Sequence, residues 1–349
     1  MSDRKQLLHE LEAIARRSAC GSPPSPAAAL DLLKSAQGDV QLTALASVIL
    51  GHAWQHLSEH HKAQMAFSTA IEGFKQAQRP KDETEAIILL GMSYLQSGEP
   101  LRALDSWSTA LLLARKINDR EQCTRVYLGV SQVYIGFGDF HSALSFNELA
   151  LEMARRLKHA ERKCEALLNV ASDAFRLGRY SYTLQCVAEA EKILATSVSN
   201  KIWSAEVVYF RGRVHAEQGH CLQAKLELET AFQLSEQNEN LWGKAHALIA
   251  LGEVLLKLND ASAGEVLERA HAMAVEAKLN PLVQRGSLAL IAWYEEQGDL
   301  EATLPHYNWI LQGEHRATVS ISPTHMNRIQ HLMARSRVRV LDQMLQTSS

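Results

Sequence analysis

The chain has 349 residues, of which 46% are hydrophobic and 21% charged, a composition typical of a folded protein rather than a disordered one. Its net charge of -3 gives no overall attraction to nucleic acid, so we expect no nucleic-acid partner. No run approaches the roughly 18 consecutive apolar residues that a membrane-spanning helix needs, so we expect no membrane segment.

The cysteines bear on the compartment. They are widely spaced, and no two of them form a Cys-x-x-Cys pair: Cys20, Cys123, Cys164, Cys186 and Cys221. This spacing predicts neither a disulfide framework nor a zinc ribbon. The first 20 residues alternate charged residues with leucines and lack the continuous apolar core of a signal peptide. We therefore expect free thiols and a cytoplasmic protein.

Two helices are predicted at the start of the chain. Residues 5–18 have the apolar spacing of an amphipathic helix, and the sequence GSPPSP at 21–26 ends it because proline cannot continue a helix. Pro26 suits the first position of a second helix. We interpret residues 1–39 as N-terminal capping helices that cover the apolar end of the structure that follows.

A repeat of about 40 residues then extends along most of the chain. Its clearest mark is a turn residue that recurs in steps of 40, 40, 40, 41, 40 and 39 residues, at Ser58, Gly98, Gly138, Gly178, Gly219, Asn259 and Gly298. Glycine accepts backbone conformations that are closed to other residues and so ends the helix before it. Seven copies at a nearly constant period indicate an array of helical hairpins.

Each first helix carries a large residue eight positions before the turn, and a small residue often follows it, as in Leu90 and Gly91. We expect the small residue to let the backbone of a neighbouring helix approach closely. Tyr94 follows four residues after Leu90 and so lies on the same helical face. After the turn, a small residue such as Ala103 lets the two helices of a hairpin cross tightly.

At this point the chain resembles the tetratricopeptide-repeat (TPR) family. The copy that carries the resemblance best has Leu90, Gly91, Tyr94, Gly98, Ala103, Trp107 and Ala110. Later copies are looser, and the period of 40 exceeds the 34 residues typical of the family. The resemblance implies an all-α fold, a right-handed superhelix (α-solenoid) of about seven TPR-like hairpins over residues 40–315, with N- and C-terminal capping helices.

The C-terminal part has a different character. The sequence GEHRATVSISPTH, which begins at Gly313, reads as a turn-rich connector, and a final helix is predicted from about Thr324 to Gln346. We assign residues 316–349 to this connector and helix. One face of the helix is apolar and is able to cap the last repeat. Another face offers a second partner contact through Arg328, Arg335 and Arg339.

The resemblance also implies that the first helices of successive hairpins line a concave groove where an extended partner binds. Its register places the following residues toward that groove: His52, His56, Met92, Leu95, Gln96, Arg125, Gln132, Glu165, Arg176, Glu206, Tyr209, Arg213, Glu217, His246, Glu253, Lys257, Arg285, Glu295 and Glu296. From these we select as partner-binding Met92, Leu95, Gln96, Arg125, Gln132, Arg176, Tyr209 and Arg213.

The selected arginines suit carboxylates, because a guanidinium group makes bidentate contacts with them. Met92, Leu95 and Tyr209 offer apolar pockets. The alternative is that these charges pair across adjacent helices, as Arg125 and Glu165 are placed to do.

Candidates for chemistry are few. His52, His56 and His60 lie four residues apart on one helical face, a spacing able to chelate a divalent metal, but no Asp, Glu or Cys joins them at ligand spacing. A groove surface is therefore the favoured interpretation, with no metal site. No phosphate loop, dinucleotide fingerprint or nucleophile motif occurs in the sequence. We expect no cofactor and no enzymatic activity.

Two functions fit the sequence. The first is a non-enzymatic scaffold or adaptor that binds a protein or peptide in the concave groove. The alternative is a regulatory sensor, in which a ligand alters the superhelix and the C-terminal helix passes the signal to a transcription or signalling partner.

Overall fold

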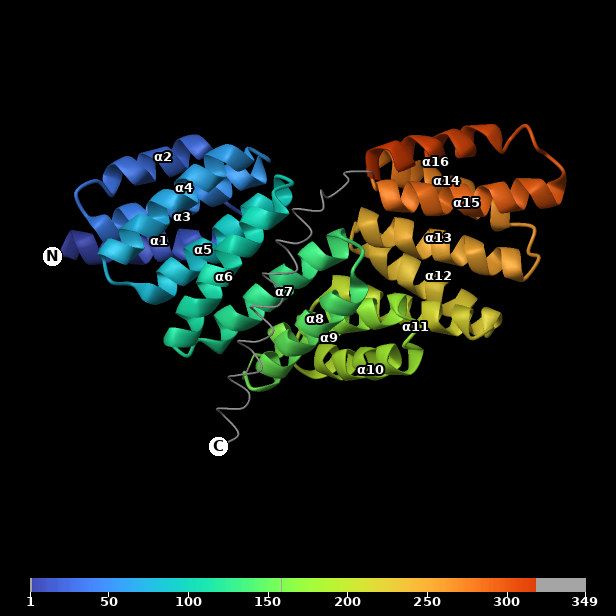
Figure 1. Ribbon diagram of the computed structural model, residues 1–349, viewed down its shortest axis with the longest axis horizontal. Coiled ribbons are helices and arrows are strands. Elements are labelled where there is room, and N and C mark those ends of the chain that lie inside the picture. The colour runs from blue at the N-terminus through green and yellow to red at the C-terminus, as the bar shows by residue number, and fades with distance from the viewer. Residues whose placement is uncertain (1, 158, 318–349) are drawn as a thin grey trace. The chain divides into compact units, whose positions relative to one another are not determined.

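The computed structural model describes residues 2–157 and 159–317, and within these ranges the regular structure is entirely α-helical (Figure 1). These residues form two compact units, 2–157 and 159–317. The first unit contains α1 (Ser2–Ala19), α2 (Pro26–Ser35), α3 (Val40–His56), α4 (His60–Gln76), α5 (Pro80–Gln96), α6 (Pro100–Lys116), α7 (Arg120–Gly136) and α8 (Phe140–Arg155). The second unit contains α9 (Ala160–Arg176), α10 (Tyr180–Thr196), α11 (Lys201–Glu217), α12 (Cys221–Gln237), α13 (Leu241–Lys257), α14 (Ala263–Glu276), α15 (Asn280–Gln297) and α16 (Leu304–Ala317).

From α3 onward the helices pack as consecutive hairpins. Each pair from α3/α4 to α15/α16 packs together, and within each unit the second helix also packs on the first helix of the next hairpin. The described residues thus contain seven hairpins, as the sequence predicts. The prediction of an all-α TPR-like array is confirmed.

The first helices of successive hairpins also touch one another within each unit. α5 contacts α7, and α9, α11, α13 and α15 contact each other in order. We call these first helices, α3 to α15 in odd numbers, the inner helices. The residues predicted to meet a partner lie on this layer.

The turn inside each hairpin has the geometry that the sequence predicts. After α5, the N–H of Glu99 donates to the carbonyl of Tyr94 at 2.8 Å, and that of Gly98 donates to Leu95 at 3.1 Å. This pair of hydrogen bonds is the Schellman motif, which requires a left-handed backbone conformation at the position of Gly98. All seven predicted turn residues adopt positive φ, including the non-glycines Ser58 (59°) and Asn259 (51°). The register of the repeat is therefore confirmed.

Connections between hairpins use the same left-handed turn, which the sequence did not reveal. Four of them place a non-glycine residue at φ of 54° or 55°, namely Gln78, Asn118, Glu239 and Lys278. Non-glycine residues at positive φ are uncommon, and without a glycine the pattern gives no signal. As a result, helices in most of the array begin every 20 residues, although the sequence repeats every 40.

The small residues of the inner helices have a different role from the expected one. A Cβ on Gly91 would lie 2.5 Å from Nε1 of Trp107, and one on Gly129 would lie 2.7 Å from Cζ2 of the same ring. Trp107 is fully buried and donates from Nε1 to the carbonyl of Ile88 at 3.2 Å. The expectation of close backbone approach is therefore wrong here, because a large side chain of the second helix fills the space.

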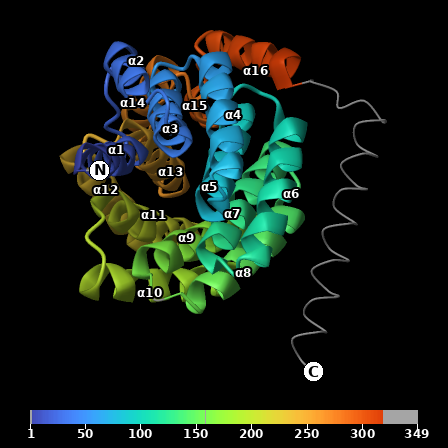
Figure 2. The same ribbon diagram turned by 90° about the vertical axis from the view of Figure 1, so that its left-hand side faces the viewer.

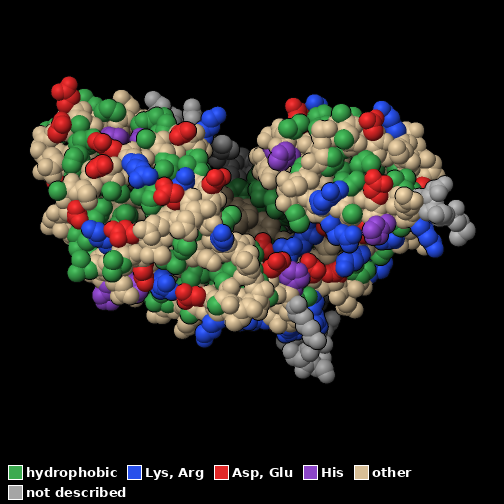
Figure 3. All heavy atoms as spheres, turned by 180° about the vertical axis from the view of Figure 1, so that it is seen from behind, with side chains coloured by type: hydrophobic (Ala, Val, Ile, Leu, Met, Phe, Trp, Pro, Cys, Tyr) green, Lys and Arg blue, Asp and Glu red, His purple; other side chains and the backbone are tan. Residues whose placement is uncertain are grey.

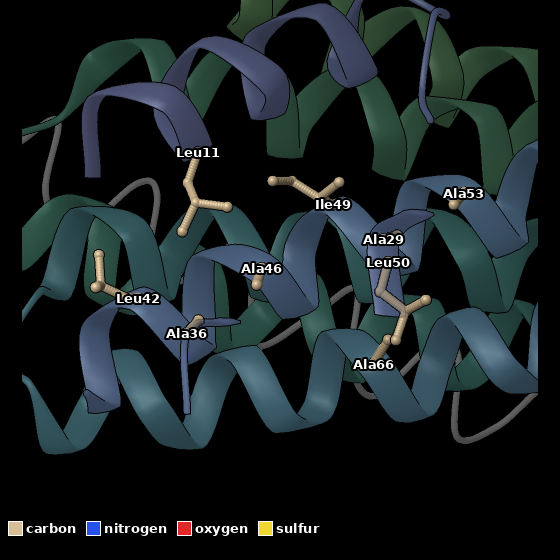
Figure 4. Close-up of a cluster of buried hydrophobic side chains, with 9 residues drawn as sticks. All are labelled: Leu11, Ala29, Ala36, Leu42, Ala46, Ile49, Leu50, Ala53 and Ala66. Carbon is tan, nitrogen blue, oxygen red and sulfur yellow. The ribbon is translucent and has the colours of Figure 1, made fainter. Parts of the chain in front are cut away.

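The first two helices pack on α3, and α1 and α2 lie beside it in both ribbon views (Figure 2). Leu11 of α1 and Ala29 of α2 join Ile49 of α3 in one buried apolar cluster (Figure 4). Arg4 also pairs with Asp39 at 2.5 Å, and Asp39 caps α3 by accepting from the N–H of Leu42. These two helices occupy the place of a cap, while the proposed boundaries at residues 39 and 315 stay predictions.

The predicted start of the C-terminal connector at Gly313 is wrong, because α16 continues through Gly313 to Ala317. The helix predicted from Thr324, with Arg328, Arg335 and Arg339, lies outside the described residues. Among the helices that are described, none is long and apolar enough to cross a membrane.

Replacing the buried indole tests the role of the glycine pair. Trp107→Ala removes the side chain that fills the space beside Gly91 and Gly129, so we expect a loss of about 3–5 kcal/mol in the free energy of unfolding. Urea unfolding followed by circular dichroism measures this loss. Leu112→Ala, at a residue of the same helix that is 52% exposed, is the control and should change stability by less than about 0.5 kcal/mol.

Candidate functional site

Acidic and basic side chains are interspersed with apolar ones over the surface in Figure 3. A net charge of -3 agrees with this mixture. The candidate site therefore has to be built from the contacts of individual residues on the inner helices rather than from a patch of one sign.

In the first unit, the selected residues of α5 are less available than expected. Met92 and Leu95 are partly buried and pack against the core cluster around Trp107. Gln96 is exposed and accepts a hydrogen bond from Gln55 Nε2 of α3 at 2.8 Å. Their position on an inner helix did not reveal that the two apolar side chains already have packing partners.

The residues of α7 differ from each other. Arg125 donates from Nη1 to Glu85 Oε1 of α5 at 3.1 Å, so a pairing across inner helices exists here. The predicted pairing of Arg125 with Glu165 would join the two units and stays a prediction, while within its own unit Glu165 accepts from Arg162 at 2.8 Å. Gln132 is exposed to solvent.

The three histidines do not form a metal site in the structure. His52 packs edge-on against the ring of Phe67, and burial lowers its pKa to about 4. His56 ends α3 and His60 begins α4, on the two sides of the turn. Nowhere in residues 2–157 and 159–317 do three or more His, Cys, Asp or Glu side chains gather as metal ligands would.

In the second unit, Tyr209 is the centre of a cluster that joins three inner helices. This buried phenol on α11 accepts a hydrogen bond from Arg213 Nη1 at 3.0 Å and lies 3.4 Å from Nδ1 of His246 on α13. The charge of Arg285 on α15 also acts on the phenol and lowers its pKa. Arg285 also donates hydrogen bonds from Nε and Nη2 to the two carboxylate oxygens of Glu253, at 2.6 and 2.5 Å. We call these five residues the tyrosine cluster.

The arginines give the tyrosine cluster a positive electrostatic character. Burial raises the pKa of the Tyr209 phenol, but the charges of Arg213 and Arg285 outweigh it and hold this pKa below its usual value. Burial, followed by the charges of Arg285, Arg213 and Arg176, lowers the pKa of His246 to about 3. The imidazole is therefore neutral at physiological pH.

Arg213 lies between aromatic rings and has only a distant acidic neighbour. Its guanidinium is 4.7 Å from the centroid of the Phe175 ring and 5.9 Å from that of Tyr209. Its recorded carboxylate contact is to Glu217, at 3.8 Å, which is longer than a hydrogen bond. Arg176 is more exposed and lies 3.6 Å from the buried Asp173. Arg213 thus contacts Tyr209 directly, and the charge of Arg176 acts on His246, while the selection of these residues as partner-binding stays a prediction.

A second group of residues on α11 and α13 shares Tyr209 and His246 with the tyrosine cluster. Trp242 is 43% exposed, and its ring centroid lies 3.9 Å from that of His246. Glu206 lines the same small cavity as Tyr209, Trp242 and His246. We call these four residues the Glu206 corner. Sequence reasoning omitted Trp242, although its position one turn before His246 places it on the same face.

Comparison with known proteins agrees with this architecture. Residues 83–156 match the sequence profile of the tetratricopeptide repeat. These residues carry tetratricopeptide repeats. No curated protein matches it significantly.

Solved structures resemble the chain in fold. The apo form of RapI is 16% identical with a TM-score of 0.64, covering 76% of this chain and 95% of RapI. A Rap protein complexed with Competence and Sporulation Factor is 15% identical with a TM-score of 0.61, covering 98% of this chain and 97% of that one. NprR in complex with its cognate peptide NprX is 14% identical with a TM-score of 0.60, covering 96% of this chain and 98% of NprR. At such low identities these likenesses show the fold of the chain alone, and its binding residues have to be argued from its own side chains.

The environment of Glu206 predicts a pH-dependent stability. Burial raises the pKa of this carboxyl from 4.5 to about 7, so the folded protein holds the proton more tightly than the unfolded chain does. The stability that this proton contributes is present below about pH 4.5 and is lost as the pH rises through about 7. Glu206→Gln removes that loss, so we expect the variant to gain up to ~3 kcal/mol relative to the wild type between pH 4.5 and pH 8.

Urea unfolding of both proteins across this pH range measures the difference. His246 titrates in both, so its contribution cancels. Glu276→Gln, at an exposed residue of α14, is the matched control and should show the same difference from the wild type at every pH. If Glu206→Gln behaves like this control, the carboxyl is not desolvated.

Proposed function

We propose that the second unit binds a peptide, or a peptide segment of a protein partner, along the inner helices α11, α13 and α15. The observation that carries this proposal is the convergence of Tyr209, Arg213, His246 and Arg285 from these three helices. They combine hydrogen-bond donors with aromatic surface, which is the composition of many peptide-binding faces.

Arg213 is the group best suited to hold an acidic group of the ligand. Its carboxylate contact to Glu217 is loose, whereas Arg285 is fully engaged by Glu253. The bond from Arg213 to Tyr209 and its packing on Phe175 fix the guanidinium in place before a ligand arrives. Such preorganisation favours binding because less side-chain entropy is lost on association. Arg176 supplies a second, more exposed guanidinium on α9.

A similar use of the fold supports the proposal by analogy. NprR, which shares this architecture, has been solved with its cognate peptide NprX. We propose a non-enzymatic adaptor or regulator for the present chain, acting in a reducing compartment because all five cysteines are free thiols. In the first unit, Arg125, Gln96 and Gln132, with the exposed edges of Met92 and Leu95, are the proposed contacts for further partner residues.

Selection from a displayed library of linear peptides tests this function. We expect the wild-type chain to enrich peptides that carry Asp, Glu or a free C-terminal carboxylate. Arg213→Gln should weaken their binding by roughly 10- to 100-fold, the effect of losing a hydrogen bond to a charged group. Fluorescence anisotropy with synthetic peptides measures the affinities.

The control variant makes the same Arg→Gln change on a second helix instead of an inner helix. Arg269→Gln lies on α14, a second helix, and its side chain is 57% exposed, so peptide affinity should not change. Failure to enrich any peptide, or an equal loss in both variants, would contradict the proposed function.

A further inference from the structure

We infer that the Glu206 corner binds a primary ammonium group of the ligand, either a peptide N-terminus or a lysine side chain. This inference rests on the proposed function and deepens it. It assigns the tyrosine cluster to the acidic group of the peptide and the Glu206 corner to a cationic group.

Glu206 differs from Glu165, Glu217 and Glu253, three other acidic residues on the inner helices of the second unit. Glu253 pairs with Arg285, Glu165 with Arg162, and Glu217 lies beside Arg213. For Glu206 no ion pair or hydrogen bond is recorded within the described residues, and burial is the cause of its raised pKa. A partly buried carboxylate without a cation is a costly arrangement, and a ligand cation would relieve it.

The neighbouring side chains suit a compact cation. The exposed ring of Trp242 offers its face, and an indole is the strongest cation–π partner among the aromatic side chains. His246 packs 3.9 Å from that ring and is neutral, so it does not repel a positive charge. The cavity between these residues has room for about one water-sized group. An ammonium group is of that size, whereas a planar guanidinium is wider.

The spacing on α11 fixes the distance between the two charged groups of the ligand. Glu206 and Arg213 are seven residues apart, which is roughly 10 Å along the axis at 1.5 Å per residue. Tyr209 lies between them on the same face. An extended peptide spans ~3.3–3.6 Å per residue, so the ammonium and carboxylate groups would be separated by about three residues.

Binding of a cation should release a proton. At pH 6 Glu206 is mostly protonated, with a pKa of about 7, and an ammonium group stabilises the ionised form. The other ionisable groups around it are Cys164 of α9, whose pKa burial raises to about 11, and His246 and Tyr209, while Arg213 and Arg285 act on His246 and Tyr209. Because His246 is already neutral at pH 6, the released proton comes from Glu206.

The test uses small probes on the full chain labelled with 5-fluorotryptophan. Nα-acetyl-lysine N-methylamide represents the lysine source, and alanine N-methylamide represents the peptide N-terminus. We expect at least one of them to shift the fluorine signal of Trp242, assigned with Trp242→Phe, while the acetylated, uncharged form of the same probe leaves it unchanged. Glu206→Gln should weaken the binding at least tenfold, whereas Glu276→Gln should leave it unchanged.

Calorimetry at pH 6 in buffers of different ionisation enthalpy supplies a second measurement. We expect release of about 0.9 proton per ammonium bound by the wild type and none for Glu206→Gln. No shift with either ammonium probe, equal shifts with the acetylated probes, or unchanged binding by Glu206→Gln would overturn the inference. If the ammonium probes fail to bind but the peptide selection succeeds, ammonium binding by the Glu206 corner is wrong and the proposed peptide-binding function stands. If the probes bind but the selection fails, the proposed peptide-binding function is wrong and ammonium binding by the Glu206 corner stands.

Discussion

The array depends on large side chains of second helices that fill spaces left by glycines on the inner helices. Trp107 of α6 lies against both Gly91 of α5 and Gly129 of α7, so one indole joins a hairpin to the next. Phe67 has the same relation to Gly51, and Leu267 to Gly252. A Cβ at these glycines would collide with the ring or branched chain, so packing sets the distance between the two layers. On α11, which carries much of the candidate site, Gly212 faces Leu228 in a similar way, and a Cβ there would lie 3.0 Å from Cγ of Leu228.

The inner helices of the second unit carry several polar side chains that pair with one another. Arg285 and Glu253 do so completely, through two parallel bonds. Arg213 does so incompletely, and Glu206 has no recorded partner among the described residues. In a packed protein, buried polar groups are usually paired, and those left over mark places where binding yields the largest gain. The two incompletely satisfied groups lie on the same helix, α11, with a tyrosine between them.

The sequence allowed much of this to be predicted, for identifiable reasons. The period located all seven turns inside hairpins, even where Ser58 and Asn259 replace glycine, because their spacing from neighbouring copies is conclusive. It did not reveal the turns at Gln78 or Lys278, since those residues carry no conformational signature. On the inner helices, position along the repeat was the basis for selecting Tyr209 and Arg213 as partner-binding, which stays a prediction. Position along the repeat did not indicate how deeply a side chain is buried or whether it has a polar partner. For that reason the sequence analysis did not foresee that Met92 packs against the core, and it did not single out Glu206.

The left-handed turns between hairpins have a consequence for folding. Because both kinds of turn share one backbone geometry, α4, α5, α6 and α7 begin at exact steps of 20 residues, and the main chain does not distinguish an inner helix from an outer one. A folding chain shifted by a single helix would form the same turns and the same helical hydrogen bonds. Side-chain volume alone opposes that shift, since it would bring the tryptophan of one layer against residues that leave it no space. Fidelity of assembly in this array is therefore a property of a few bulky residues and the glycines that face them.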